Sequence, residues 1–204
     1  MPLSPPAPRE HLHTRRIECR GYRRTDGLWD IEAQIVDTKT YAFENGWRGT
    51  VEPGGPVHDM HVRITVDDRL VIHDAEAVTV ASPFRICPEA APNFARIRGI
   101  RIRPGWMREV KQRYGGREGC THILELLRPL ATTAFQTIFP YLERLRREGQ
   151  PGDEMARSAG PQIDSCYAYA SDRDVVRQYW PELYTGEEDG PAALKAAPSR
   201  SDSA

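Results

Sequence analysis

Residues 60–80, MHVRITVDDRLVIHDAEAVTV, decide the fold. Met60, Val62, Ile64 and Val66 alternate with polar residues, and this period of two predicts a strand with one buried face. Asp67-Asp68-Arg69 predicts a turn, because acidic and polar residues favour tight reversals of the chain. Residues 70–80 then return as a second strand, so the stretch predicts a β-hairpin.

An earlier segment repeats this pattern. Residues 14–24 and 27–37 flank Thr25-Asp26-Gly27, which contains a hairpin turn signal. Apolar side chains occupy alternate positions of the later strand: Trp29, Ile31, Ala33 and Ile35. A Gly- and Pro-rich connection at 38–56 joins the two hairpins. The four strands therefore predict one antiparallel sheet with a buried face and a solvated face.

The second half of the chain predicts helices. A short helix is expected within 88–98, ending at Gly99, and another follows Pro104 and ends at Gly115-Gly116. A long helix is expected from Thr121 to about Arg147, and a further short one at 172–180. The long helix has an apolar stripe: Ile123, Leu127, Leu130, Ala134, Ile138, Leu142 and Leu145. Pro129 and Pro140 are expected to kink or split it. Strands followed by helices predict an α+β fold, an antiparallel sheet of about four strands packed by C-terminal helices.

Composition predicts the boundaries of the domain. Of the 204 residues, 1–13 carry four prolines and are expected to form a disordered arm. Residues 14–148 are predicted to form the α+β domain, and 149–161 a linker. Residues 162–186 are expected to be a C-terminal extension that packs on the domain. The acidic and then Ala-, Pro- and Ser-rich stretch 187–204 is expected to be a disordered tail.

Charge and hydropathy exclude several classes of protein. The formal net charge is −1, so no global imbalance indicates nucleic acid or a membrane surface. No apolar run is long enough to span a membrane, and the N-terminus has no continuous apolar stretch typical of a signal peptide. A cytoplasmic protein with reduced thiols is therefore expected. P-loop, Gly-x-Gly-x-x-Gly, Gly-x-Ser-x-Gly and Cys-x-x-Cys motifs are absent from the sequence.

Two cysteines are expected at helix N-termini. Cys120 and His122 lie where the long helix begins, and the helix dipole there favours a thiolate beside an imidazole. Cys87 precedes the short predicted helix, so the two thiols can converge over one sheet. Thiolates and imidazoles are ligands of zinc and of iron–sulfur clusters. Cys166, after the linker, is a further candidate ligand, although burial of each thiol as a small apolar group is the alternative.

A histidine before the third strand adds a ligand candidate. His58 and Asp59 precede the regular alternation that starts at Met60, and His61 follows three residues after His58. On a strand, residues three apart point to opposite faces, so His58 and His61 are not expected to bind one ion. The predicted metal ligands are Cys87, Cys120, His122, His58, Asp59 and Cys166.

Residues 96–117 are strongly basic, with eight cationic side chains and one acidic residue, Glu109. This segment could attract an acidic protein partner. A solvated basic helix face is the alternative, and nucleic acid is not expected because no nucleic-acid-binding motif accompanies the segment.

The order of these elements resembles the NifU/IscU iron–sulfur scaffold fold. The stretch from Asp59 to Ala77 is similar to that family's hairpin, and its three ligand places would fall on His58, on Cys87, and on Cys120 with His122. The resemblance covers roughly residues 57–140 and implies an iron–sulfur or metal site. The family's Leu-Pro-Pro-x-Lys chaperone site is absent. The whole chain also resembles a bacterial family of uncharacterised proteins, through stretches such as Gly119-Cys-Thr-His-Ile-Leu-Glu-Leu-Leu127.

Three functional hypotheses follow. The first is a metal- or iron–sulfur-binding accessory protein. The second is a thiol enzyme or sulfur carrier with Cys120 as nucleophile, His122 or His58 as base, and Asp59 or Glu125 as the orienting group. The third is a non-catalytic interaction module that uses the basic segment 96–117.

Overall fold

The computed structural model describes residues 3–149 and 162–186. The chain divides into two compact units, residues 1–153 and 154–204. The elements of the first unit are β1 (His13–Arg23), β2 (Trp29–Lys39), β3 (Phe43–Asn45), β4 (Gly49–Val51), β5 (Pro56–Val66), β6 (Ile72–Ala81), η1 (Cys87–Ala90), η2 (Pro92–Ile97), α1 (Trp106–Tyr114), η3 (Gly116–Glu118) and α2 (Thr121–Arg147). The second unit contains α3 (Asp174–Tyr179) and the 3-10 turn Pro181–Leu183.

The predicted four-stranded antiparallel sheet is confirmed. Its order is β1-β2-β5-β6, and every neighbouring pair is antiparallel. The β1–β2 hairpin turns at the predicted Asp26-Gly27, where Asp26 Oδ1 accepts the Leu28 N–H and Gly27 has a φ of 88°. A positive φ favours glycine, so the sequence dictates this turn. The connection 38–56 contains a small hairpin, β3–β4, that the sequence analysis did not predict.

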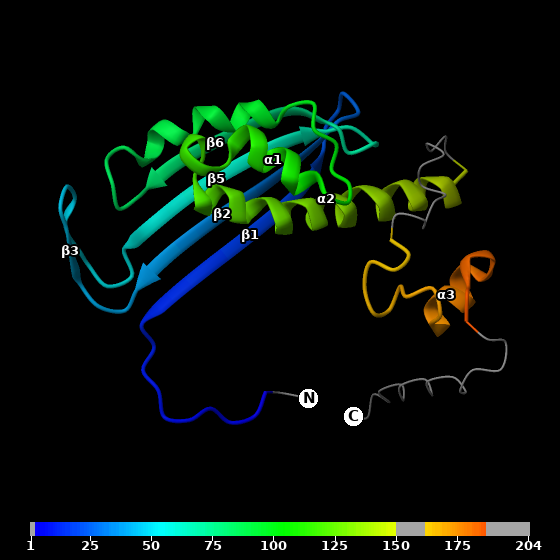
Figure 1. Cartoon of the computed structure of the whole chain (residues 1–204), viewed down its shortest axis with the longest axis horizontal. Coiled ribbons are helices and arrows are strands. Elements are labelled where there is room, and N and C mark those ends of the chain that lie inside the picture. Colours follow the sequence, from blue (N-terminus) through cyan, green and yellow to red (C-terminus); the bar gives the residue numbers. More distant parts are fainter. Residues whose placement is uncertain (1–2, 150–161, 187–204) are drawn as a thin grey trace. The chain divides into compact units, whose positions relative to one another are not determined.

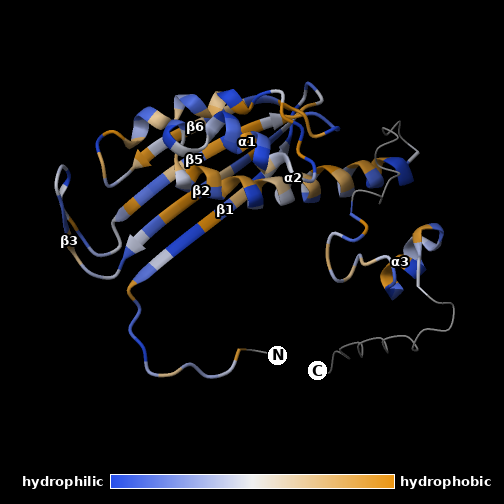
Figure 2. Cartoon of the chain, in the orientation of Figure 1, coloured by the Kyte–Doolittle hydropathy of each residue, from blue (hydrophilic) through white to orange (hydrophobic). Residues whose placement is uncertain are grey.

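Helices and 3-10 turns cover one face of the sheet (Figure 1). α2 packs mainly against β1 and β2 and less against β5, while η2 packs against β6. Along β2 and β5 the buried side chains alternate with less buried, mostly polar ones, and Figure 2 shows the resulting alternation of colour. The buried set of β5 includes Met60, Val62, Ile64 and Val66, as the sequence predicts.

The long helix α2 has the predicted bounds, and its buried stripe includes Ile123, Leu127, Leu130, Ala134 and Ile138. The prediction that its prolines could split it is wrong, since Pro129 and Pro140 lie inside one continuous helix. The hydroxyls of Thr132 and Thr133 donate to the Pro129 carbonyl. The helix approaches β1 so closely that a Cβ at Gly21 would overlap the Thr137 side chain.

The expected helix within 88–98 forms instead two 3-10 helices, η1 and η2. Pro92 would lie inside one continuous helix over 88–98, where it has no N–H to donate to the Pro88 carbonyl, and it instead begins a second short helix. The expected helix at 172–180 is observed as α3. The predicted arm, residues 1–13, has no helix or strand before β1 in its described part, and β1 already includes His13. The predicted linker 149–161, apart from Gly149, and the tail 187–204 lie outside the described residues.

Leu127→Ala should test whether α2 forms the core. Leu127 is fully buried, so truncation removes apolar contacts and leaves a cavity, at a cost of about 2–5 kcal/mol in the free energy of unfolding. Val80→Ala, a control at a side chain that is 64% exposed on β6, should cost far less. Urea unfolding followed by circular dichroism measures both. Equal midpoints for the two variants would contradict the packing.

Candidate functional site

A buried carboxylate lies on the covered face of the sheet. The buried alternate positions of β2 end at Asp37, whose side chain is 0% exposed. The strand register places Asp37 opposite Arg15 of β1 and opposite His58 of β5. Because directly opposed residues point to the same face, these three side chains form one row across three strands, on the face that α2 covers.

Hydrogen bonds and charge stabilise this carboxylate. Arg15 donates from Nε to Asp37 Oδ1 at 2.8 Å and from Nη2 to Oδ2 at 2.9 Å. His13 Nε2 lies 3.1 Å from Oδ1, and His58 Nδ1 lies 3.0 Å from Oδ2. A buried charge is costly unless it is paired and hydrogen-bonded, and Asp37 satisfies both conditions.

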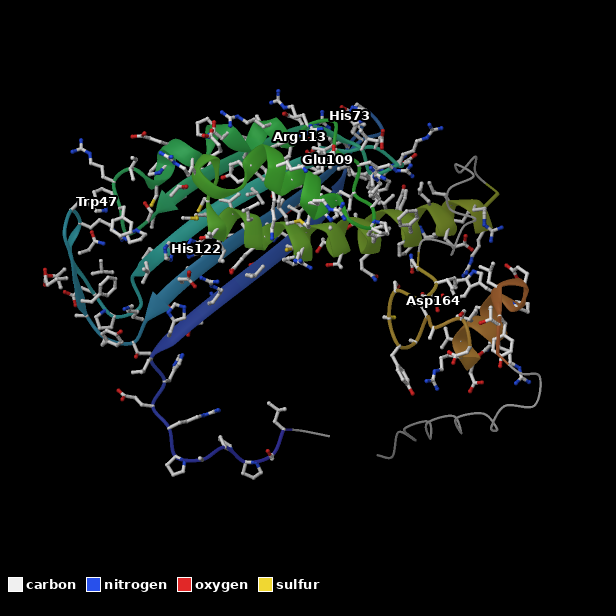
Figure 3. All side chains as sticks on the ribbon, viewed as in Figure 1. Trp47, His73, Glu109, Arg113, His122 and Asp164 are labelled. Atoms are coloured by element: carbon white, nitrogen blue, oxygen red, sulfur yellow. The ribbon has the colours of Figure 1, made fainter. Side chains whose placement is uncertain are left out.

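The first turn of α2 brings a second imidazole to Asp37. Cys120 is the N-cap residue with an extended backbone, and His122 follows in the first turn, where Figure 3 labels it. The His122 ring stacks on the His58 ring with 3.7 Å between centroids. Its Nε2 lies 3.9 Å from Asp37 Oδ2. Glu125, one turn further along α2, pairs with the Arg15 guanidinium and so links the helix to β1.

Three of these side chains bring potential ligand atoms close together. Asp37, His58 and His122 each offer one ligand atom, and the three atoms lie within 4.8 Å of one another. In residues 3–149 and 162–186, no other group of three or more His, Cys, Asp or Glu side chains converges in this way. We refer to Asp37, His58 and His122 as the triad.

The electrostatics favour a charged Asp37 and neutral histidines. Burial acts to raise the pKa of Asp37, but the hydrogen bonds and charge of Arg15, with His13 and His58, lower it to about 2. Burial lowers the pKa of His58, and the neighbouring His122 lowers it further. Burial and the charge of Arg15 lower the pKa of His122. The triad therefore presents one anionic oxygen donor and two neutral nitrogen donors at neutral pH, which a metal ion requires.

The structure brings together two of the predicted ligands, His58 and His122, and separates others from them. Asp59 points to the uncovered face of the sheet, where Gln34 Nε2 donates to it at 2.8 Å and His61 Nε2 lies 3.0 Å away. His58 and His61 therefore lie on opposite faces. The reason is the pleat of β5, which sends neighbouring side chains in opposite directions.

The thiols lie outside the triad. Cys120 caps α2 as predicted, but its Sγ contacts Met60 Sδ at 3.8 Å. Cys87 begins η1 and is half-buried, while Cys166 is exposed in the second unit. Neither Cys87 nor Cys120 belongs to the converging ligand set of the described residues.

Sequence reasoning missed Asp37, Arg15 and His13. A signal for Asp37 is present in the sequence, because the period of two that runs from Trp29 through Ile35 continues to position 37. A carboxylate at a position where the pattern demands an apolar side chain indicates a buried charge with partners. Arg15 and His13 lie on the edge strand β1, where burial is incomplete and the alternation gives a weaker signal.

At least three of the eight cations of the basic segment 96–117 have acidic partners. Arg96 pairs with Glu118, Arg98 with Asp74, and Arg113 with Glu109. These pairs reduce the positive charge that the segment offers to a partner. The interaction-module hypothesis stays a prediction. No helix of the described residues combines the length and the apolar character needed to cross a lipid bilayer.

The stability of the protein should fall on acidification. Because the pKa values of His58 and His122 are lowered from 6.5, the folded protein binds fewer protons there than the unfolded chain. Their contribution is complete above pH 6.5 and is lost as the pH falls below it. The contribution of Asp37 is present above 3.8 and is lost as the pH falls toward 2.

Urea midpoints measured across this pH range test the linkage. The double variant His58→Gln, His122→Gln should show a smaller loss below pH 6.5 than the wild type, whereas His73→Gln should retain the wild-type loss. Figure 3 labels His73 well away from His122. A wild-type midpoint that stays constant as the pH is lowered from 6.5 would contradict the assignment.

A family model matches residues 13–136, more than half of the chain. The matched region begins at His13 and includes all three residues of the triad. The chain has no significant match among curated proteins or among solved structures, so the resemblance to the NifU/IscU fold has no support from them. The chain therefore belongs to the family of proteins of unknown function DUF2889.

Proposed function

We propose that this protein is a metal-binding accessory protein that holds one divalent transition metal, zinc or iron(II), through Asp37, His58 and His122. The observation that carries the proposal is the convergence of one ligand atom from each residue within 4.8 Å. The residues come from β2, β5 and α2, so the convergence depends on the fold and not on a local motif.

The donor set favours a single ion over a cluster. Two imidazoles and one carboxylate suit zinc or iron(II), whereas iron–sulfur clusters take thiolates as their main ligands. The thiols of the described residues lie outside the triad. Three protein donors leave at least one coordination position for water or for another molecule, as in zinc sites that act on a substrate.

To accept an ion, the stacked rings of His58 and His122 must turn, because an imidazole holds a metal near its own ring plane. Bonds of roughly 2.0–2.2 Å to zinc place donor atoms about 3–3.5 Å apart. His58 Nδ1 and Asp37 Oδ2 are 3.0 Å apart, and His122 Nε2 at 3.9 Å needs to move closer. A neutral imidazole can shift its proton to the other ring nitrogen and so free the coordinating one. Arg15 continues to hold Asp37, as an outer partner that fixes the ligand.

Metal titration of the triad variants tests the proposal. Wild-type protein should bind one equivalent of Zn²⁺ or Co²⁺ in a chelator-treated sample. His58→Ala and His122→Ala should each lose this binding, because each removes a direct donor. Asp37→Asn should weaken it, because the amide is neutral.

Two controls make the test specific. Cys120→Ala should keep full stoichiometry, and the Co²⁺ complex should lack a sulfur-to-metal charge-transfer band. His73→Gln, a change at an exposed histidine paired with Asp67, should match the wild type. If Cys120→Ala bound less metal while its circular dichroism stayed unchanged, Cys120 would be a ligand. That result would overturn the assignment of the triad.

A second candidate function is thiol chemistry at Cys120. It is favoured by Tyr114, which is fully buried and whose hydroxyl lies close to the Cys120 backbone. Burial raises the pKa of Tyr114, and the negative charge of a Cys120 thiolate raises it further, so the two groups are neighbours. A neutral phenol beside a helix N-terminus can donate to a thiolate and stabilise it. Asp37, which orients His58, would replace Asp59 as the group that positions a base.

Alkylation rates distinguish this candidate. If Cys120 is a nucleophile, iodoacetamide near neutral pH should modify it faster than Cys19, Cys87 and Cys166, and Tyr114→Phe should slow its modification. Peptide mass spectrometry measures all four sites in one sample. Cys166 is the reference for an exposed thiol. Modification of Cys120 more slowly than Cys166 would contradict thiol chemistry and leave the metal site unaffected.

A further inference from the structure

A third histidine contacts the triad's carboxylate from the solvent side. His13 Nε2 lies 3.1 Å from Asp37 Oδ1, while His58 Nδ1 lies 3.0 Å from Oδ2. Two imidazoles therefore use different oxygens of one carboxylate. Arg15 bonds to both oxygens, so it holds the carboxylate fixed between the two histidines.

Exposure decreases along this series of side chains. The exposed fraction of the side chain is 47% for His13, 24% for His122, 15% for His58 and 0% for Asp37. His11, still further out, is exposed, and its Nε2 lies 3.0 Å from the His13 carbonyl oxygen. A half-exposed imidazole, that of His13, thus contacts the buried carboxylate directly.

We propose that His13 is the entry ligand of the metal site, a step that rests on the proposed function of the triad. A divalent cation binds first to His13 and Asp37 Oδ1. It then passes to Asp37 Oδ2, His58 and His122, and His13 returns to its hydrogen bond with Asp37. No covalent or redox change is involved, because one set of coordination bonds replaces another.

The physical reason is the cost of removing a hydrated cation from water in one step. Buried sites impose a desolvation penalty, and an intermediate with one imidazole and one carboxylate oxygen divides that penalty between two smaller barriers. Asp37 belongs to both stages, so the cation keeps one anionic ligand throughout. An entry ligand stabilises the transition state in both directions, and it therefore changes the rates of loading and release and leaves the equilibrium affinity unchanged.

His13→Gln separates this role from a structural one. The glutamine amide keeps an N–H donor that can replace the hydrogen bond to Asp37, but it lacks the imidazole nitrogen that a transition metal prefers. The matched control is His73→Gln, since His73 is 48% exposed and pairs with an aspartate, Asp67, at 2.9 Å. Figure 3 places His73 far from His122 along the domain.

Stopped-flow kinetics with the full-length protein tests the proposal. Loading with Zn²⁺ and release to a chromophoric chelator should both be slower in His13→Gln, by about tenfold, with the dissociation constant unchanged. His73→Gln should match the wild type in both rates. Wild-type rates in His13→Gln would show that the cation enters by another route and would overturn the proposal.

Two further outcomes also decide the question. A weaker equilibrium affinity in His13→Gln with an unchanged loading rate would make His13 a permanent ligand and overturn its role in entry. Absence of Zn²⁺ binding by the wild type in an equilibrium titration would remove the triad itself, and entry with it. The equilibrium titration thus tests the metal site, and the rates test the entry step.

Discussion

The burial of one charge, the Asp37 carboxylate, constrains the surrounding structure. It lies where β2 would otherwise present another apolar side chain to α2, so every lone pair needs a donor. Arg15 supplies two of these donors and also pairs with Glu125 of α2. The edge strand, the central strand and the helix are therefore held at this end of the domain by ionic contacts, whereas apolar packing holds them elsewhere.

The fold was largely predictable because apolar residues recur regularly in the sequence, with the period of a strand in the first half and that of a helix in the second. Alternation in β2 and β5 and the apolar stripe of α2 are local properties of the sequence, and each follows from one buried face. The 3-10 turns η1 and η2 were harder, because prolines at 88 and 92 interrupt a pattern that otherwise suits a helix. The β3–β4 hairpin has strands of three residues, which is too short for a period to be seen.

The site was predictable only in part. His58 and His122 could be selected by residue type and by their positions at element ends. Their partner Asp37 could not be selected in this way. Which residue lies opposite His58 depends on the strand register, which is a long-range property of the sheet. Asp59 was selected because it is next to His58 in the sequence. On a strand, however, neighbouring side chains point to opposite faces of the sheet, so Asp59 points away from the triad. Cys87 and Cys120 were selected because they were expected at helix N-termini. That position does not determine which side chains of other elements lie close to the thiols.

The ion pair between Arg15 and Glu125 joins residues that are 110 positions apart in the sequence. A growing chain contains both partners only after Glu125 has been added. The ion pair therefore cannot form before the first turns of α2 have been synthesised. Until then Arg15 lacks its partner on the helix, although its other partner, Asp37 of β2, is already present. The triad likewise needs His122, so a bound ion would mark a chain that has been extended past the start of α2.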